Sequence, residues 1–543
     1  MSESTPDTPA EKHTEAGHPK GLYVLFGAEM WERFCYYTMR GLLTLYLIKA
    51  LAMGDEKAIG IYGAYTALVY AAPVLGGKIA DKILGYRKAV ILGGVMMALG
   101  EGVICFGSEH ALYLGMGIII IGNGYFKANI SSIVGNLYKD GDPRRDSGFT
   151  IFYMGINIGA VMATLVGAPV GESLSQGPLG HAGYLVGFGL AGVGMLVGLA
   201  MFISGKNSLE GRGEPPNPEK LRAPVFLGLS LQTVTIVLSF LAIPALYFLV
   251  QYKTLVDVVL LIALAGVLVQ LLIAAFADGG RVQRDRMFVL LILMVFNVVF
   301  WACFEQAGSS LTLFADRNVD RMVFGLEMPA SMTQFFNPAF IILFGSVFSF
   351  LWVWLEKKNA NPNIPLKFGL GIILLGCGYL VLTVGAGMSD ADAKVPLALL
   401  ALMYLMHTVG ELFLSPIGLS MVTKLAPRGM TGTVMGAWFL SFAFANSVAA
   451  YIAQLTGSGG VGSVARLYTR AEVLGYPGTL DRLVTKAMHM MHTSYWDELD
   501  AASQDSLDSY VEIFTTMGVI SVAIGIALSL GSHWLNKMMH GVK

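Results

Sequence analysis

Residues 22–50 read LYVLFGAEMWERFCYYTMRGLLTLYLIKA, an apolar segment with four charged side chains in its interior: Glu29, Glu32, Arg33 and Arg40. At about 1.5 Å per residue, a helix of this length crosses the roughly 30 Å hydrocarbon core of a bilayer. A charge that faces lipid would cost a few kcal/mol. The segment is therefore predicted to be a membrane helix whose charged side chains face protein partners or a wet cavity.

The charges of this segment follow a helical spacing. Glu29, Arg33, Tyr36 and Arg40 are separated by four, three and four residues, which places them on one narrow stripe. An alternative is that Glu29 and Arg33 form only an intrahelical ion pair near the membrane surface. That alternative accounts for two of the charges but not for four, so the pattern favours a solute or ion pathway.

The composition extends this interpretation to the whole chain. Of the 543 residues, 55% are hydrophobic and only 13% are charged, about half the usual share for a soluble protein. The pattern is typical of an all-α polytopic membrane protein. The cysteines lie inside apolar segments, with neither metal-ligand spacing nor a disulfide framework, and are interpreted as small core residues: Cys35, Cys105, Cys303 and Cys377. The basic loops require no nucleic-acid partner.

Fourteen apolar segments follow one another along the chain. Lys and Arg gather at the termini and in alternate loops, so by the positive-inside rule both termini are expected to be cytoplasmic. No apolar h-region precedes the first segment, so no cleaved signal peptide is expected. The segments are 22–50, 58–80, 87–107, 110–137, 148–171, 181–204, 224–248, 254–277, 286–315, 331–356, 366–388, 395–425, 430–456 and 509–536.

These segments divide as six, two and six. The polar, Pro- and Gly-rich stretch 205–223 is the clearest linker. Two related six-helix halves are typical of alternating-access transporters, whose substrate site lies at the midplane between the halves. The expected domains are a cytoplasmic tail (1–21), an N-terminal bundle (22–204), the linker (205–223), a peripheral transmembrane hairpin (224–277) and a C-terminal bundle (278–543) with an external insert (457–509) that could form a short helical cap.

The loop after the second segment carries a specific pattern. GGKIAD (76–81) followed by GYRK (85–88) matches the G-G-x-x-A-D-x-x-x-G-x-R-K loop of the major facilitator superfamily. Its glycines let two helices approach closely, and Asp81 and Arg87 can satisfy helix termini. This loop is expected to serve gating and structure rather than substrate recognition.

Other charges in membrane segments can be paired by depth. Arg40 lies about 16 Å beyond Glu29 along its helix, toward the outside, at the level expected for Glu305. Lys127 and Glu411 lie on inward-running segments near the middle of the membrane. We therefore predict Arg40 with Glu305 as an external gating pair, and Lys127 with Glu411 as an internal gating pair or as a bracket around a ligand.

A cavity with Arg33 and Lys127 on one side and Glu411 on the other suits a zwitterion, since it offers cations to a carboxylate and an anion to an ammonium. Asn157 and Asn337 could add hydrogen bonds. The hydroxyl of Ser415 could line the same cavity, one turn after Glu411. Aromatic residues that could form tolerant walls, although packing alone is the commoner role of such side chains, are Tyr36, Tyr37, Tyr70, Trp301, Phe304 and Trp438.

A buried glutamate beside an arginine can take up a proton when its partner leaves, which would couple protons to the conformational change. His407 lies one turn before Glu411 and could relay protons, but a core role is favoured. Glu101 and Asp257 are interpreted as helix-end or peripheral charges. No nucleophile–base set, metal cluster or phosphate loop is visible, so no cofactor is expected besides protons.

At these residues the chain resembles the proton-coupled oligopeptide transporters (the POT or PTR family) of the major facilitator superfamily. The helix-1 motif E-x-x-E-R-F-x-Y-Y is matched by EMWERFCYY (29–37). GYFKANIS (124–131) and FYMGINIG (152–159) resemble the signature of helices 4 and 5, and GELFLSP (410–416) resembles the tenth core helix. The hairpin 224–277 looks like the two helices added in bacterial members.

The resemblance implies uptake of di- and tripeptides with protons across a bacterial inner membrane. A monomer is compatible with this activity. It implies proton coupling by Glu29, Glu32, Arg33 and Glu305. The implied substrate-binding residues are Arg33, Tyr36, Tyr37, Tyr70, Lys127, Asn157, Trp301, Asn337, Glu411, Ser415 and Trp438. The chain departs from animal members where their helix-2 histidine is replaced at Gly63, so protons must rely on carboxylates.

Two other classes of protein are alternatives to a peptide symporter. An exporter or antiporter of another solute, such as a drug or nitrate, would share the fold, but nitrate would not require Glu411 opposite Lys127. A membrane-embedded peptidase would need a nucleophile–base or metal set that the sequence lacks. A channel is disfavoured because the two gates would alternate.

Overall fold

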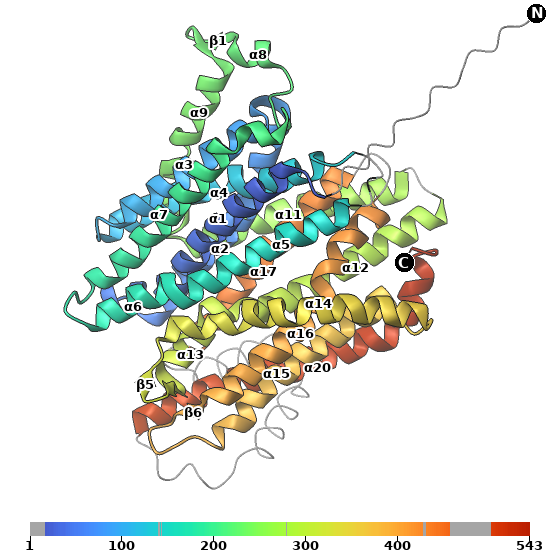
Figure 1. The fold of residues 1–543 in the computed structure, drawn as a ribbon. Coiled ribbons are helices and arrows are strands. Elements are labelled where there is room, and N and C mark those ends of the chain that lie inside the picture. Colours follow the sequence, from blue (N-terminus) through green and yellow to red (C-terminus); the bar gives the residue numbers. More distant parts are fainter. Residues whose placement is uncertain are drawn as a thin grey trace, which may run out of the picture.

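The computed structural model describes residues 17–542, apart from 140, 141, 143, 278–279, 427–430 and 457–500. In the part of the chain it describes, almost all regular structure is helical (Figure 1). The N-terminal half contains the helices α1 (Lys20–Leu45), α2 (Asp55–Ile79), α3 (Tyr86–Ile104), α4 (Glu109–Asn136), α5 (Arg145–Met162), α6 (Ala168–Gln176) and α7 (Ala182–Ser204).

The C-terminal half is drawn in yellow to red in Figure 1 and lies beside the blue and cyan N-terminal half. Its helices are α12 (Arg281–Phe304), the 3₁₀ helix η5 (Glu305–Gly308), α13 (Ser310–Asn318), the 3₁₀ helix η6 (Ala330–Phe335), α14 (Phe336–Lys357), α15 (Ile364–Ala386), α16 (Leu397–Leu425), α17 (Thr431–Gln454) and α20 (Ala501–Met538).

Helices occupy all fourteen segments predicted from the sequence. Among the described residues, twelve helices are long and apolar enough to cross a membrane. The other two, α1 and α3, carry more charges but pack inside the same bundle, α1 against α5 and α7, and α3 against α4 and α7. The prediction of an all-α membrane protein is confirmed, whereas the count of fourteen spans and the cytoplasmic termini stay predictions.

Between the halves lie α8 (Pro218–Arg222), a short antiparallel pair β1 (Pro224–Phe226) and β2 (Leu229–Ser230), and the helices α9 (Leu231–Leu241), α10 (Ile243–Leu249) and α11 (Lys253–Ala277). The helix predicted to begin at residue 224 begins at Leu231 instead. Gly228 takes a left-handed turn, and the Ser230 hydroxyl caps the helix by accepting from the Thr233 N–H.

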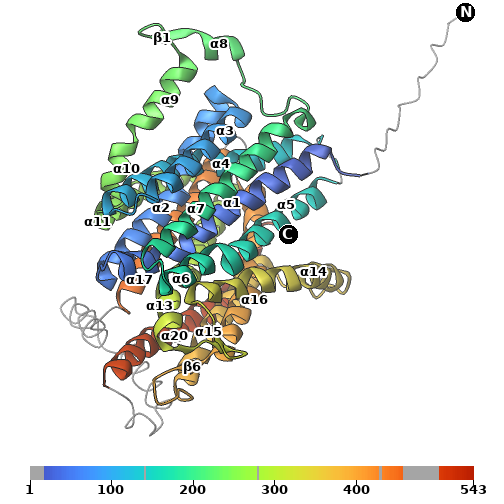
Figure 2. The same ribbon diagram turned by 60° about the vertical axis from the view of Figure 1, so that its left-hand side comes forward.

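Figure 2 shows α9, α10 and α11 along one edge of the molecule. Helix α10 packs on α4 of the N-terminal half, and α11 packs on α17 and α2. Asp257 in α11 accepts a hydrogen bond from Ser447 and pairs with Lys253 at 2.6 Å. The expected peripheral position is therefore seen, but Asp257 ties the hairpin to the C-terminal half.

Short strand pairs lie at the end of the C-terminal half that we assign to the outside. The parallel pair is β3 (Val319–Asp320) with β6 (Val395–Pro396), and the antiparallel pair is β4 (Met322–Val323) with β5 (Leu326–Glu327). The external insert predicted at 457–509 lies mostly outside the described residues, and its last residues form the start of α20.

The glycine-rich loop positions two helices of the N-terminal half. A Cβ atom at Gly76 would overlap the backbone of Gly124, so α2 and α4 approach closely only because no side chain stands there. Arg87 pairs with Glu214, and its N–H donates to the carbonyl of Gly213 at 2.9 Å. The loop therefore holds the linker 205–223 against the N-terminal half.

Candidate functional site

Glu29, Glu32 and Arg33 form a compact cluster on α1, which we call the α1 cluster. Arg33 Nη2 donates to Glu32 Oε1 at 2.6 Å, and Arg33 Nε lies 3.3 Å from Glu29 Oε1. None of the three residues is more than 3% exposed. Two carboxylates thus share one guanidinium inside the protein, which leaves one of them without a cation of its own.

The α1 cluster includes the intrahelical pair that the sequence allowed as an alternative, but it extends beyond that pair. Asn123 of α4 donates to Glu32 Oε1 at 3.4 Å. Glu29 Oε2 has no hydrogen-bond partner in the described part of the chain, although it is buried. A buried oxygen of this kind is ready to accept a proton or a donor group.

Two cations meet above one tyrosine ring next to this cluster. The Arg33 guanidinium lies 5.1 Å from the centre of the Tyr36 ring, and Lys127 Nζ lies 5.8 Å from the same centre. Lys127 Nζ also lies 4.3 Å from the centre of the Tyr70 ring. This arrangement, built from α1, α2 and α4, concentrates positive charge on one side of the site.

The opposite charge comes from the C-terminal half. Glu411 of α16 is buried, and its Oε2 accepts from Asn337 Nδ2 of α14 at 2.9 Å. The same Asn337 nitrogen donates to Thr408 Oγ1 at 3.1 Å. Asn337 therefore orients Glu411, and Thr408 is a member of this group that the sequence analysis did not single out. Ser415 lies one turn further along α16 and is partly exposed.

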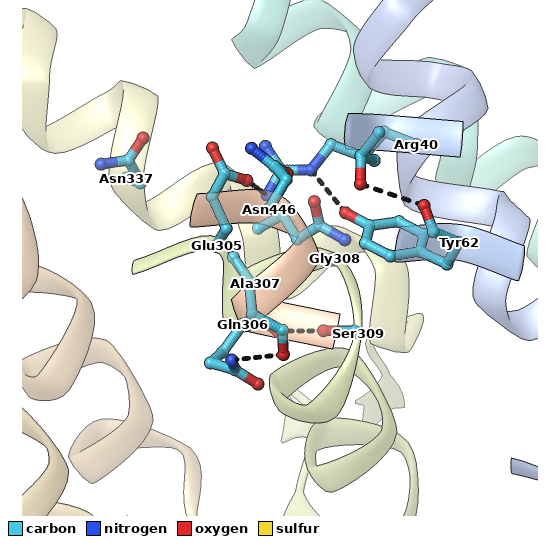
Figure 3. Close-up of polar contacts among 12 residues, drawn as sticks. Arg40, Tyr62, Glu305, Gln306, Ala307, Gly308, Ser309, Asn337 and Asn446 are labelled. Atoms are coloured by element: carbon cyan, nitrogen blue, oxygen red, sulfur yellow. Dashed lines mark hydrogen bonds and ion pairs between the residues drawn. The ribbon is translucent and has the colours of Figure 1, made fainter. Parts of the chain in front are cut away.

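Arg40 and Glu305 meet across the two halves toward the outside (Figure 3). Arg40 Nη2 lies 2.7 Å from Glu305 Oε2, an ion pair whose angles do not make a hydrogen bond. Arg40 Nε donates to the hydroxyl of Tyr62 at 3.0 Å. Tyr62 of α2, absent from the predicted site, therefore holds the guanidinium that faces Glu305.

Lys127 and Glu411, predicted as the internal gating pair, form no ion pair among the described residues. In this conformation the ammonium of Lys127 faces aromatic rings, while Glu411 is bonded by Asn337. Tyr37 lies beside the outer pair, with the Arg40 guanidinium 5.9 Å from the centre of its ring.

The aromatic residues of the two halves meet at Phe442 of α17. Tyr70 of α2 stacks on this ring with centroids 6.2 Å apart, and Trp301 of α12 lies 5.1 Å from it. Trp438 contacts it edge-on at 6.1 Å. Phe442 was not among the predicted aromatic residues, although its spacing of four residues from Trp438 places both on one face of α17. Phe304 also joins this group, with its ring centroid 5.0 Å from that of Trp301.

Asn157 of α5 is almost fully buried, and its Nδ2 donates to the Tyr153 carbonyl of its own helix at 3.0 Å.

Gly63 stands where a Cβ atom would overlap Ala450 of α17, so the helix seam has no room for an imidazole there. This packing agrees with a site whose ionisable groups are carboxylates.

Glu101 was interpreted as a helix-end or peripheral charge; it does lie in the last turn of α3, but a peripheral position is wrong. Its side chain is fully buried in the N-terminal half, where Cys35 Sγ lies 3.6 Å from Oε1 in a hydrogen bond. The reason is that α3 packs between α4 and α7, so its outer turns face the bundle interior. His407 is a core residue, as favoured: it is buried and bonded to the Leu375 carbonyl at 3.0 Å.

All four cysteines are free thiols. The described residues contain no group of three or more His, Cys, Asp or Glu that could hold a metal ion. The described side chains of the site form ion pairs, hydrogen bonds and ring contacts. Its cations lie on α1 and α4, the carboxylate that Asn337 binds lies on α16, and aromatic residues lie on both halves.

Comparison with known proteins adds independent findings. A family profile described as the POT family matches residues 87–465. An uncharacterized transporter YclF of Bacillus subtilis is 36% identical over 451 residues, which cover 81% of this chain and 88% of that protein. The dipeptide and tripeptide permease A of Chromobacterium violaceum is 31% identical over 522 residues, which cover 96% of this chain and 94% of the permease.

Solved structures are similar over nearly the whole chain. A crystal structure of a peptide transporter POT in complex with sulfate is 32% identical, with a TM-score of 0.75 and 97% of each chain covered. A POT family transporter in complex with 5-aminolevulinic acid is 27% identical, with a TM-score of 0.73, covering 96% of this chain and 98% of that one.

Proposed function

Because this chain belongs to the POT family, we propose that it imports di- and tripeptides together with protons by alternating access. The chain is a multi-pass membrane protein with the major facilitator fold, and it is a peptide transporter rather than an enzyme. The proposal adds the direction of transport, the roles of single residues and the bacterial inner membrane as its location. The division into two six-helix bundles, a linker and an accessory hairpin is part of the same proposal.

The observation that carries the proposal is the separation of charge between the halves. Arg33 and Lys127 of the N-terminal half lie over the ring of Tyr36, whereas Glu411 of the C-terminal half is held by Asn337. A peptide has a carboxylate at one end and an ammonium at the other, so it would bridge these two sides. The substrate would thereby pull the halves together around itself.

Side chains of the peptide would lie against aromatic rings from both halves, which tolerate different shapes because ring contacts are not directional hydrogen bonds. The proposed substrate-binding set comprises Arg33, Tyr36, Tyr37, Tyr70, Lys127, Asn157, Trp301, Asn337, Glu411, Ser415 and Trp438.

Protons would enter through the α1 cluster and Glu305. When the carboxylate of a peptide binds Arg33, the guanidinium is drawn away from Glu29 and Glu32, and a carboxylate without its cation takes up a proton in a buried site. Protonation of Glu305 would likewise release Arg40 at the outer side. Proton entry and opening of the outer side would then depend on the same ion pairs.

The driving force is sufficient for uptake. One proton that moves down a membrane potential of about 100 mV supplies about 2.3 kcal/mol, which supports roughly a 50-fold peptide gradient. The coupling ion is a proton, no cofactor takes part, and a monomer contains every residue named for the site.

The deciding experiment measures uptake of labelled dialanine into proteoliposomes with an inward proton gradient. We expect accumulation that disappears when the gradient is collapsed, while exchange against internal peptide continues. A lack of peptide uptake together with counterflow of another solute would instead support the exporter or antiporter. Recovery of free alanine inside the liposomes would support a peptidase.

A further inference from the structure

Glu172, in the middle of α6 in the N-terminal half, makes a contact with the C-terminal half that no ion pair explains. Its Oε1 accepts a hydrogen bond from the backbone N–H of Ala330 at 2.9 Å, and its Oε2 accepts from the N–H of Ser331 at 2.9 Å. The side chain is fully buried. The contact lies where α6 packs against η6, the segment that leads into α14.

The partners of Glu172 are the first residues of η6, whose N–H groups lack carbonyl partners within the helix. A carboxylate is the best partner for such groups, because it accepts strong hydrogen bonds and favours the positive end of the helix dipole. Among the described residues, Glu172 has no lysine, arginine or histidine within ion-pair distance. The two N–H groups are therefore what compensates a buried charge.

The segment that Glu172 grips leads directly to the substrate site. The 3₁₀ helix η6 continues into α14, whose second residue is Asn337. Within η6, the Gln334 amide donates to Thr312 Oγ1 of α13 at 2.9 Å. This hydrogen bond holds η6 against α13. Asn337 then donates to Glu411. A shift of η6 along its axis would therefore move Asn337 relative to Glu411.

We propose that Glu172 is a positioning residue, which caps η6 across the two halves when the outer side is closed and thereby sets Asn337 for the amino end of the substrate. The inference rests on the proposed peptide transport and assigns one more residue to it. Opening of the outer side would separate α6 from η6, leave two N–H groups without partners, and release Asn337. The carboxylate thus links closure of the outer side to the shape of the binding site.

Glu172 differs from the ion pairs that also join the two halves. Lys49 with Asp316 and Asp55 with Arg317 join flexible side chains that can turn and re-form their pairs at several separations. Glu172 holds backbone atoms, so it reports and restrains the position of the helix itself. This is why its loss should alter substrate recognition as well as closure.

The first test measures closure without transport. In a background that lacks the four native cysteines, spin labels at Phe106→Cys and Phe324→Cys, both strongly exposed, report the distance between the outer ends of the halves. We expect Glu172→Ala to shift the ratio of closed to open distances toward open by about tenfold, since two charge-assisted hydrogen bonds are lost. Glu172→Asp, which reaches only part of the way, should give an intermediate shift.

The matched control is Glu109→Gln, which removes an outer carboxylate whose partners Lys57 and Tyr113 lie in its own half. It should leave the distances unchanged. Glu172→Gln keeps the side-chain volume and one accepting oxygen, so it replaces the alanine variant if that protein does not fold. Distances in these variants equal to those of the parent would overturn the proposal.

The second test asks for the positioning role. Peptide counterflow is compared for dialanine and N-acetyl-dialanine, which lacks the ammonium. We expect the preference for dialanine to fall about tenfold or more in Glu172→Ala and to recover partly in Glu172→Asp, because Asn337 no longer presents Glu411. An equal loss of counterflow for both substrates would show that Glu172 has only a structural role. Inactivity of the parent protein with peptides would instead refute the proposed function.

Discussion

The two ends of the seam between the halves are built differently. Toward the outside, polar contacts cross the seam repeatedly: Arg40 with Glu305, Thr44 Oγ1 to the Gly308 carbonyl at 2.7 Å, and the bidentate pair of Arg317 with Asp55 at 2.5 and 2.8 Å. Toward the inside, the predicted pair of Lys127 and Glu411 is separate in this structure. The two halves are therefore held together at the end that we assign to the outside.

Closure at the outer end of the seam uses several pairs of different strength. Arg40 and Glu305 are deeply buried, so neither can lose its partner cheaply. Lys49 and Asp316 are partly exposed and contribute little. The hydrogen bonds to Asp55 raise the pKa of Arg317 above its ordinary value, so the Arg317 guanidinium stays charged at every physiological pH. We propose that proton sensitivity comes from glutamates deeper in the membrane.

The largest effect is expected at the inner end of the seam. Lys127→Ala should reduce peptide uptake to background, because the substrate carboxylate and, in the other conformation, Glu411 both lose a cation. Uptake of labelled dialanine by proteoliposomes is the measurement. Lys57→Ala, which removes an exposed lysine outside the site, is the control and should transport normally. Normal uptake by the Lys127 variant would contradict the proposed role of Lys127 in substrate binding.

Glu32→Gln should separate proton coupling from binding. The amide cannot take up a proton, so accumulation driven by a proton gradient should be lost, while counterflow of peptide at equal pH remains measurable. The measurement compares the two assays in the same proteoliposomes. Full proton-driven accumulation by this variant would show that the α1 cluster does not couple protons through Glu32.

Arg40→Ala should open the outer side. It leaves Glu305 buried without its cation, which costs roughly 3–5 kcal/mol and should shift the closed-to-open ratio by more than about 100-fold. The label pair at positions 106 and 324 measures the ratio. The double variant Arg40→Ala/Glu305→Ala should recover part of the closure, since no unpaired charge remains. A double variant as open as the single one would contradict this explanation.

Lys49→Ala should have the smallest effect. Its pair with Asp316 spans 2.6 Å, but the lysine side chain is 37% exposed, and such pairs contribute about 0.2–1 kcal/mol. We expect at most about a fivefold change in the closed-to-open ratio, which should vanish in high salt. A shift as large as that of Arg40→Ala would show that surface pairs, rather than the buried pair, hold the outer side closed.

Several features were predictable because they depend on single residues and their spacing. The stripe of Glu29, Arg33 and Arg40 follows from helical periodicity and from the cost of charges in lipid. Depth along the helices, at 1.5 Å per residue, placed Arg40 at the level of Glu305, and the two side chains meet in the structure. Their role as a gate remains a prediction, as do the other site assignments.

Other features had no signal in the sequence. Glu172 looks like an ordinary polar residue at a helix end, because its partners are backbone N–H groups more than 150 positions away. Glu101 looks peripheral until α3 is seen to turn it toward Cys35. The α9 segment began later than predicted because a local turn and cap at Gly228 and Ser230 outweighed the apolar composition of residues 224–230.

Hydrophobic length and helical spacing act locally, so they identify a helical membrane protein with buried charges from the residues alone. Which of those charges meet depends on how the helices pack: Arg40 meets Glu305 and Tyr62, whereas Lys127 faces tyrosine rings. The reason is physical. The energy of an ion pair or a cap depends on distances of a few ångströms between helices that are remote in sequence, and packing of the two halves sets those distances.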